Sequence, residues 1–298
     1  MKKGYYKMIS YDYYKVFYYV CKYKNFTKAA NVLVTSQSSV SHTISNLEKQ
    51  LGCRLFNRNN RGIELTPEGR QLYDYVSIGC EQFLKGENEI LNSISLDGGT
   101  IYLGATETAL HCFLFNALDK FHILHPNVKY KINSYSTIDS ILAVKNGIVD
   151  MAITATPFDL SSNLRTISLT KIQDILIGGI NFEGIIPNTL SLEELCNYPF
   201  ITYSSESKSR FFMEEIFQSH NLILTPTIES ATSDLILPMV KHGLGLGFIP
   251  EIMAKNAITN HEVISISTKE AIPKREICLV YDIHHPHSTA SNEFIKYL

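Results

Sequence analysis

Apolar residues near the N-terminus recur at helical spacing. The positions separated by three and four residues are Tyr13, Val16, Phe17, Val20 and Cys21. This spacing predicts a helix with one buried stripe. A second, short helix is expected to begin near Thr27, with Asn25 as its N-cap.

A third helix is predicted by four apolar positions, Val40, Ile44, Leu47 and Leu51, and Gly52 is placed to end it. Its opposite side carries small or polar residues, namely Ser38, His42, Ser45 and Lys49. Short side chains let a helix approach DNA closely, and Gln37 can hydrogen-bond an adenine edge. The pattern favours a helix-turn-helix, although an ordinary three-helix bundle with a polar outer face has the same periodicity.

The next segment predicts a basic hairpin. Leu55-Phe56 is expected to anchor a strand, residues 57–62 form a basic turn, and Ile63-Glu64-Leu65 alternates as a returning strand. Such a wing would place Arg58 and Arg61 against phosphates or the minor groove. A new helix is expected after Thr66, with Pro67 at its first position.

Residues 26–66 closely resemble the winged helix-turn-helix of LysR-type transcriptional regulators. The matching motifs are Phe26-Thr27-Lys28-Ala29-Ala30, Ser36-Gln37, Val40-Ser41, Leu47-Glu48, Leu51-Gly52, Leu55-Phe56-Asn57-Arg58 and Leu65-Thr66-Pro67-Glu68-Gly69. The resemblance implies double-stranded promoter DNA as a partner. It implies base or nearby phosphate contacts from Gln37, Ser38, Ser41 and His42, and backbone contacts from Thr27, Arg58 and Arg61. His42 departs from the Arg or Lys that is frequent in the family.

One long helix is predicted from Pro67 to about Ser93. Val76, Phe83 and Ile90 repeat every seven residues, which is typical of a helix that pairs with a partner helix. The alternative is a helix that packs on the body of its own chain. The resemblance implies a dimerisation linker, and hence a homodimer or homotetramer.

Beyond Asp97-Gly98-Gly99, apolar strands alternate with helices, which predicts parallel α/β units. Hydroxyl residues follow several of the strands, and these serines and threonines could cap helices or line a polar ligand pocket. Gly243-x-Gly245-x-Gly247 follows a helix and precedes a strand, the wrong order for a dinucleotide turn, so we interpret it as a helix stop with close packing.

This body resembles the effector domain of the same family, a periplasmic-binding-protein-like pair of lobes. The matching motifs are Pro126-Asn127-Val128, Gly147-Ile148-Val149-Asp150, Tyr198-Pro199-Phe200-Ile201 and Gly243-Leu244-Gly245. The resemblance implies a first lobe at 99–160 plus 268–298 and a second lobe at 161–267. It implies a small-molecule effector between the lobes, contacted by Thr106, Thr108, Thr202 and Ser204, with Thr154 a weaker candidate. Arg210 is either a counter-charge for an anionic effector or an exposed helix charge.

Charge separates the two parts of the chain. Residues 1–66 carry 11 Lys and Arg against 3 Asp and Glu, whereas the remainder carries 16 against 26. A basic head on an acidic body fits a polyanion-binding module, although a solvated lysine-rich face would look the same. The six cysteines lack disulfide or zinc spacing, and His284-His285-Pro286-His287 is interpreted as a surface loop. No signal peptide, membrane span, cofactor, metal or catalytic motif is evident, so a cytoplasmic protein is expected.

The sequence therefore predicts an α plus α/β protein. It comprises a winged helix-turn-helix at 9–66, a linker helix at 67–96 and a two-lobed effector-binding domain at 97–298. The predicted function is a LysR-type transcriptional regulator that is not an enzyme, with RNA polymerase as a further candidate partner. The alternative is a cytoplasmic small-molecule-binding protein whose N-terminal module serves assembly.

Overall fold

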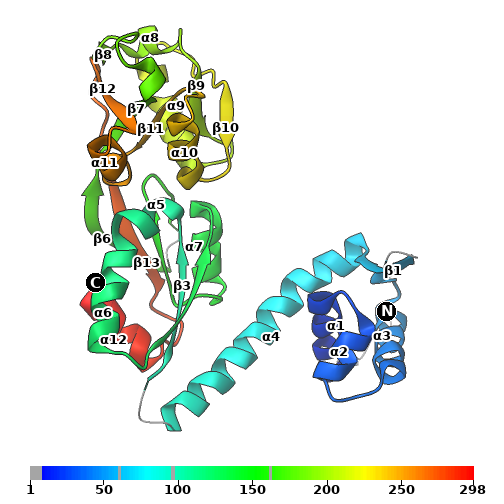
Figure 1. The fold of residues 1–298 in the computed structure, drawn as a ribbon. Helices are drawn as coiled ribbons and strands as arrows, with labels where there is room; N and C mark the ends of the chain where they lie inside the picture. Colours follow the sequence, from blue (N-terminus) through cyan, green and yellow to red (C-terminus); the bar gives the residue numbers. More distant parts are fainter. Residues whose placement is uncertain (1–8, 60–61, 95–97, 161–162) are drawn as a thin grey trace, which may run out of the picture. The chain divides into compact units, whose positions relative to one another are not determined.

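The structure is a computed structural model that describes residues 9–59, 62–94, 98–160 and 163–298. The chain divides into an N-terminal unit, residues 1–90, and a body, residues 91–298 (Figure 1). Each of these parts has its own buried core.

The N-terminal unit has the element order that the sequence predicts. Its helices and strands are α1 (Tyr11–Tyr23), α2 (Phe26–Val32), α3 (Gln37–Leu51), β1 (Phe56–Asn59), β2 (Gly62–Leu65) and α4 (Pro67–Ile94). The two strands pair as an antiparallel hairpin. The winged helix-turn-helix and the long helix that follows it are therefore confirmed.

Local side-chain chemistry sets the ends of these helices. The Asn25 side chain accepts a hydrogen bond from the backbone N–H of Lys28 at 2.9 Å, which caps α2. Gly52 ends α3 in the left-handed conformation, with φ of 76°, which glycine adopts without steric cost. The Thr66 hydroxyl accepts from the N–H of Gly69 at 3.0 Å and so satisfies a free donor at the start of α4.

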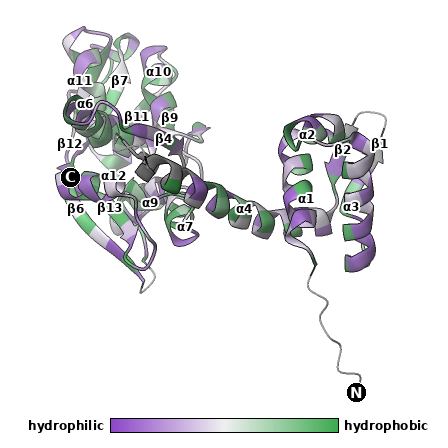
Figure 2. Cartoon of the chain, turned by 90° about the horizontal axis from the view of Figure 1, so that it is seen from below, coloured by the Kyte–Doolittle hydropathy of each residue, from purple (hydrophilic) through white to green (hydrophobic). Residues whose placement is uncertain are grey.

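The core of this unit is formed by the apolar stripes of α1 and α3, whose opposite faces are hydrophilic (Figure 2). Val40, Ile44 and Leu47 are completely buried, as the periodicity predicts. Leu51 departs from the stripe because it lies in the last turn of α3 and remains 38% exposed.

The seven-residue repeat of α4 serves two different purposes. Val76 packs against the core of the N-terminal unit, whereas Phe83 and Ile90 are 58% and 63% exposed. The Phe83 ring still meets the edge of Tyr11 with ring centroids 4.9 Å apart. Phe83 and Ile90 are therefore left largely unburied by the core of this unit.

The first lobe of the body is built on a five-stranded sheet in the order β4-β3-β5-β13-β6 within the described residues. β3, β4 and β5 are parallel, as predicted, whereas β13 runs antiparallel to both β5 and β6. The elements of this lobe are β3 (Thr100–Ala105), α5 (Glu107–Ala109), the π-helical segment η1 (Leu110–Leu114), α6 (Phe115–Leu124), β4 (Lys129–Ser134), α7 (Thr137–Lys145), β5 (Met151–Ala155), β6 (Leu164–Ile172), β13 (Arg275–Asp282) and α12 (Thr289–Tyr297).

The second lobe is built on a six-stranded sheet in the order β10-β9-β11-β7-β12-β8 within the described part of the chain. Its elements are β7 (Asp174–Gly179), η2 (Ile180–Phe182), β8 (Thr189–Leu190), α8 (Leu192–Leu195), β9 (Phe200–Tyr203), α9 (Lys208–Ser219), β10 (Ile228–Ser230), η3 (Ser233–Leu235), α10 (Ile236–Lys241), β11 (Leu246–Pro250), α11 (Glu251–Thr259) and β12 (Val263–Thr268). Gly243, with φ of 71°, ends the helix before β11, so the helix-stop interpretation is confirmed.

One predicted lobe boundary is wrong. A second lobe that begins at residue 161 would include β6, yet β6 pairs along its length with β13 in the sheet of the first lobe. The chain therefore crosses between lobes at Gln173, and it returns through residues 269–274. The prediction failed because the strand that holds β6 lies about a hundred residues further along the chain, where no local pattern can reveal the pairing.

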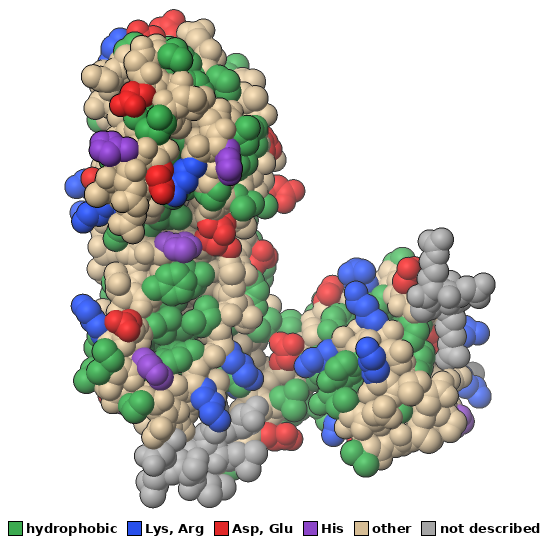
Figure 3. Space-filling view, in the orientation of Figure 1, with side chains coloured by type: hydrophobic (Ala, Val, Ile, Leu, Met, Phe, Trp, Pro, Cys, Tyr) green, Lys and Arg blue, Asp and Glu red, His purple; other side chains and the backbone are tan. Residues whose placement is uncertain are grey.

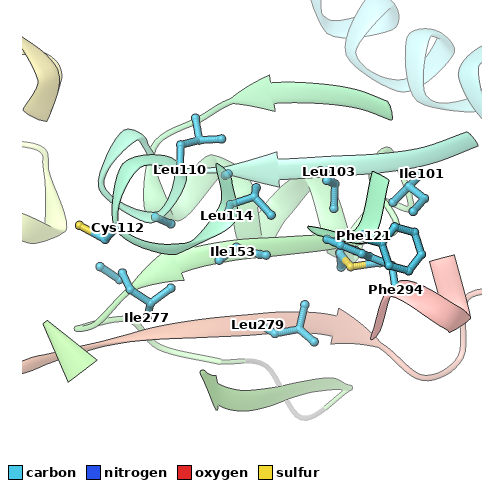
Figure 4. Close-up of a cluster of buried hydrophobic side chains, with 14 of the residues drawn as sticks. Ile101, Leu103, Leu110, Cys112, Leu114, Phe121, Ile153, Ile277, Leu279 and Phe294 are labelled. Atoms are coloured by element: carbon cyan, nitrogen blue, oxygen red, sulfur yellow. The ribbon is translucent and has the colours of Figure 1, made fainter. Parts of the chain in front are cut away.

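Apolar side chains on one face of the β3–β5–β13 layer pack with those of η1, α6 and α12 to form a core of the first lobe (Figure 4). Ile101 and Leu103 on β3, Ile153 on β5 and Leu279 on β13 are completely buried. Phe121 of α6 meets Phe294 of α12 edge to face at 4.9 Å. This packing holds the loops that follow β3 and β5 on a rigid base.

Candidate DNA-binding face and ligand cleft

Helix α3 presents a small polar face, which we call the α3 face and define as Gln37, Ser38, Ser41 and His42. Gln37, Ser38 and His42 are exposed, and Ser41 is half-buried. Thr27 is exposed in the first turn of the neighbouring α2. Because the opposite side of α3 is completely buried, packing fixes which side chains point outward.

Side-chain hydrogen bonds cap the start of α3 and hold the base of the hairpin against its end. The Ser36 side chain caps α3 by accepting from the N–H of Ser39 at 3.1 Å. At the other end, the Glu48 carboxylate accepts from the N–H of Leu55 at 2.8 Å and from that of Phe56 at 3.3 Å. These bonds fix where the hairpin leaves α3.

The basic tip of the hairpin is only partly covered by the structure. Arg61 and the side chain of Arg58 lie outside the described residues, so their proposed contacts stay a prediction. Lys28, which the sequence argument did not select, is exposed next to Thr27. Several Lys and Arg side chains are visible on the N-terminal unit (Figure 3).

The body contains a polar cleft of about 360 Å³ between its two lobes. Serine and threonine side chains from both lobes dominate its lining, with acidic residues, Lys208 and two tyrosines. The lining residues are Thr106, Glu107, Thr108, Tyr135, Ser136, Thr137, Ile138, Asp139, Tyr203, Ser204, Glu206, Ser207, Lys208, Ser209, Ala231, Thr232 and Ser233. Such a lining suits a small ligand bound mainly by hydrogen bonds.

Three of the five predicted effector residues line this cleft, and two do not. Thr106, Thr108 and Ser204 are in the lining. Thr154 is completely buried behind it and donates a hydrogen bond to the Thr137 hydroxyl at 3.1 Å. Thr202 is buried in β9, where successive side chains face opposite sides of the sheet, so its neighbour Tyr203 lines the cleft instead.

Side-chain contacts join the lobes around the cleft. The Thr108 hydroxyl donates to the Ser233 hydroxyl at 3.2 Å, and both residues are buried. Lys208 pairs with Asp159 at 3.2 Å, although Asp159 is almost fully exposed. The buried bond therefore constrains the lobe separation more than the exposed ion pair does.

The N-termini of two longer helices open onto the cleft. Ser136 caps α7 and Ser207 caps α9. The Ser136 hydroxyl also donates to the Asp139 carboxylate at 2.7 Å, which engages one of the acidic groups of the lining. Free N–H groups in the first turn of a helix favour acceptor oxygens, and they do so here on both sides of the cleft.

Tyr203 is a cleft residue that the sequence pattern did not single out. Its hydroxyl is buried, and the guanidinium of Arg275 lies beside it. Burial raises the pKa of this hydroxyl, although the nearby Arg275 lowers it in part. The group therefore stays protonated.

Arg210 fits neither of its predicted roles. It does not line the cleft, and it is 5% exposed rather than a solvated helix charge. Its guanidinium bonds Glu214 at 2.8 Å, Glu229 at 3.2 Å and the Tyr203 carbonyl at 3.2 Å. It holds α9 against β9 and β10.

Other candidate chemistry is limited in the described part of the chain. No group of three or more His, Cys, Asp or Glu residues there could hold a metal ion. His285 and His287 instead contact Asp282 at the end of β13. All six cysteines are free thiols. Among the described residues, no helix is both long and apolar enough to cross a bilayer.

Two family models match the chain. The model described as "LysR substrate binding domain" matches residues 95–298, and the model described as "Bacterial regulatory helix-turn-helix protein, lysR family" matches residues 11–70. These matches cover the cleft-bearing body and the α3 face respectively.

Curated relatives and solved structures agree with these models. The chain is 26% identical over 280 residues to a "Probable RuBisCO transcriptional regulator" of Synechocystis, a match that covers 91% of this chain and 80% of the relative. It is also 26% identical to the "HTH-type transcriptional regulator IlvY" of Escherichia coli, with coverages of 87% and 89%.

The fold of CbnR, a LysR family transcriptional regulator, superposes with a TM-score of 0.76 at 15% identity and covers 97% of this chain and 98% of CbnR. A structure of full-length CbnR complexed with its target DNA gives a TM-score of 0.74 at 16% identity, with the same coverages. The effector binding domain of QuiR in complex with shikimate gives 0.59 at 20% identity and covers 67% of this chain and 95% of that domain. The two family models together match nearly the whole chain, including the α3 face and the cleft. The chain therefore belongs to the LysR family: it is a DNA-binding transcriptional regulator, not an enzyme.

Proposed function

We propose that this LysR-type regulator binds a specific promoter site as a homodimer or homotetramer, and that a small molecule in the cleft controls the outcome. We place it in the cytoplasm, with RNA polymerase as a further partner. The main support for the proposal is the α3 face. Its hydrogen-bonding side chains are short and mostly exposed, and the other side of the helix is buried, so the face is suited to contact base edges.

Control by a small molecule is supported by the cleft and by a neighbour. The cleft is hydroxyl-rich, and its two walls come from different lobes, so a ligand there would contact both. The QuiR domain, which has a similar fold, is in complex with shikimate. We take Thr106, Thr108 and Ser204 as ligand contacts and add Tyr203. Thr154 and Thr202 would act only from behind the lining.

Self-association is supported by the later part of α4. Phe83 and Ile90 lie seven residues apart and are more than half exposed. Exposed apolar side chains at this spacing favour pairing with a second copy of the helix.

The test is a footprint on DNA upstream of the protein's own coding region, with and without cell metabolites, followed by binding to single-base operator variants. Gln37→Ala should cost about 1–3 kcal/mol at one base position, because a bidentate contact to a base edge is lost. Gln50→Ala is the matched control, since Gln50 is exposed at the far end of the same helix.

An operator profile that is identical for the Gln37→Ala variant and the unmodified protein would rule out the base contact. If the unmodified protein shows no sequence preference at any salt concentration, the alternative of a small-molecule-binding protein with an assembly module would replace this proposal.

A further inference from the structure

A buried ion pair joins the two crossovers between the lobes. Asp174 follows the first crossover and Arg275 follows the second, and both residues are 2% exposed. The guanidinium bonds both carboxylate oxygens, from Nε at 2.7 Å and from Nη2 at 2.8 Å. A bidentate pair of this kind fixes the relative position and orientation of its two backbone segments.

A second bond stitches the same two crossovers. The Gln173 amide donates to the backbone carbonyl of Ile272 at 2.9 Å. Gln173 is the single residue between β6 and β7, and Ile272 lies in the returning segment. The two crossovers therefore behave as one linked element rather than as two independent strands.

The guanidinium of Arg275 also reaches the wall of the cleft. Its Nη1 donates to the Ser209 hydroxyl at 3.0 Å, and Ser209 is a lining residue at the start of α9. The ring of Phe212 lies 5.4 Å from the guanidinium carbon and restrains it from the side of α9. One side chain thus touches the crossovers and the cleft at once.

The bond from the Arg275 guanidinium leaves the Ser209 hydroxyl free to donate its own hydrogen bond into the cleft. Since its oxygen accepts from a cation, its own proton is left to point elsewhere, and acceptance from a charged donor strengthens the bond that the hydroxyl itself donates. Tyr203, which lines the same cleft, also lies close to Arg275. A ligand oxygen in this part of the cleft would be held by hydroxyls that the guanidinium polarises.

We propose that Arg275 is a positioning residue that couples occupancy of the cleft to the two crossovers: a ligand that bonds Ser209 alters the Ser209–Arg275 bond and thereby the Arg275–Asp174 pair. This inference rests on the proposed function of the cleft as the ligand site. It adds the route by which that site acts on the relative position of the lobes.

The test compares Ser209→Ala with Ser207→Ala in the full chain. Both serines lie at the start of α9 and line the cleft, but only Ser209 bonds Arg275. Hydrogen exchange, measured by mass spectrometry, should accelerate about tenfold or more at residues 172–175 and 272–276 in Ser209→Ala, because a hydrogen bond to a charged group is lost. Ser207→Ala removes the cap of α9 and should accelerate exchange in the first turn of that helix, but it should leave these segments at the rate of the unmodified chain.

Hydrogen exchange in β3 serves as the reference for general destabilisation of the body. β3 lies inside the sheet of the first lobe, whereas α9 belongs to the second lobe. Equal crossover exchange in the two variants would overturn the proposal, and so would acceleration in β3 as large as at the crossovers. The measurement needs neither DNA nor an effector. A failure of sequence-specific DNA binding would therefore leave its result readable.

Discussion

The α3 face and the cleft use similar side chains in opposite settings. On α3, glutamine, serine and histidine project from a single helix whose other side is buried. In the cleft, serines and threonines come from two lobes and several helix starts, and Thr106, Thr108 and Ser233 are buried. The first set is suited to a large rigid partner that approaches from outside, and the second to a small molecule that is enclosed.

The difference lies in what keeps each set in place. The α3 face depends on one hydrophobic stripe and on caps that lie within a few residues of it. The cleft depends on bonds between distant segments, such as Thr108 with Ser233 and Arg275 with Asp174. We therefore expect the α3 face to be sensitive to core packing and the cleft to be sensitive to buried polar pairs.

Breaking the pair at the crossovers should give the largest effect. Arg275→Met leaves the Asp174 carboxylate buried without its partner, which should cost the body about 3–5 kcal/mol. Urea unfolding of the full chain, followed by circular dichroism, should show an early transition of the body, while hydrogen exchange in α3 remains normal.

The matched control for that variant is Lys171→Met. Lys171 pairs with Glu276, the residue next to Arg275, but at 3.9 Å and with 68% of its side chain exposed. Exposed pairs contribute little, so the unfolding curve should barely move. Equal destabilisation by the two substitutions would show that the body does not depend on its buried ion pair more than on an exposed one.

The fold was largely predictable because its patterns are local. Asn25, Gly52 and Thr66 end or begin helices by contacts within four residues, and such contacts can be inferred from sequence spacing. The parallel strands β3, β4 and β5 followed from apolar runs between helices. The boundary at 161 failed because β6 is held by β13, a partner far along the chain.

The site was predictable only in part, for the same reason. The hydroxyl clusters after the strands indicated the cleft, but they did not show which side of a strand faces it. Thr202 and Tyr203 are neighbours in β9, and only Tyr203 lines the cleft. Ser209 carries no motif, and its importance appears only when Arg275, 66 residues later, is brought beside it.

The complementary substitution in the N-terminal unit is Ile44→Ala. Ile44 is completely buried beneath the α3 face, and removing three carbons there should cost about 2–5 kcal/mol. Hydrogen exchange should accelerate throughout α3, while the crossovers of the body stay protected. Leu51→Ala is the control, since Leu51 lies in the last turn of the same helix and is 38% exposed, so its loss should cost less. A larger loss for Leu51→Ala would contradict the packing argument.

The smallest expected effect comes from removing one helix cap in the N-terminal unit and one in the body. Asn25 caps α2 and Ser288 caps α12, each by accepting a backbone N–H three residues ahead, at 2.9 Å and 3.1 Å. Asn25→Ala and Ser288→Ala should each cost about 0.5–2 kcal/mol in urea unfolding, and Asn25→Asp should retain most of the stability because aspartate also caps. The cost of Ser288→Ala should be the larger of the two, because the Ser288 hydroxyl also donates at 2.9 Å to the buried hydroxyl of Ser291. A cost for Asn25→Ala close to that of Ile44→Ala would mean that the seven-residue α2 cannot form without its cap. The α3 face would then depend on local hydrogen bonds as strongly as on its hydrophobic stripe. It would differ from the cleft only in that its contacts join residues close in sequence, whereas those of the cleft join distant segments.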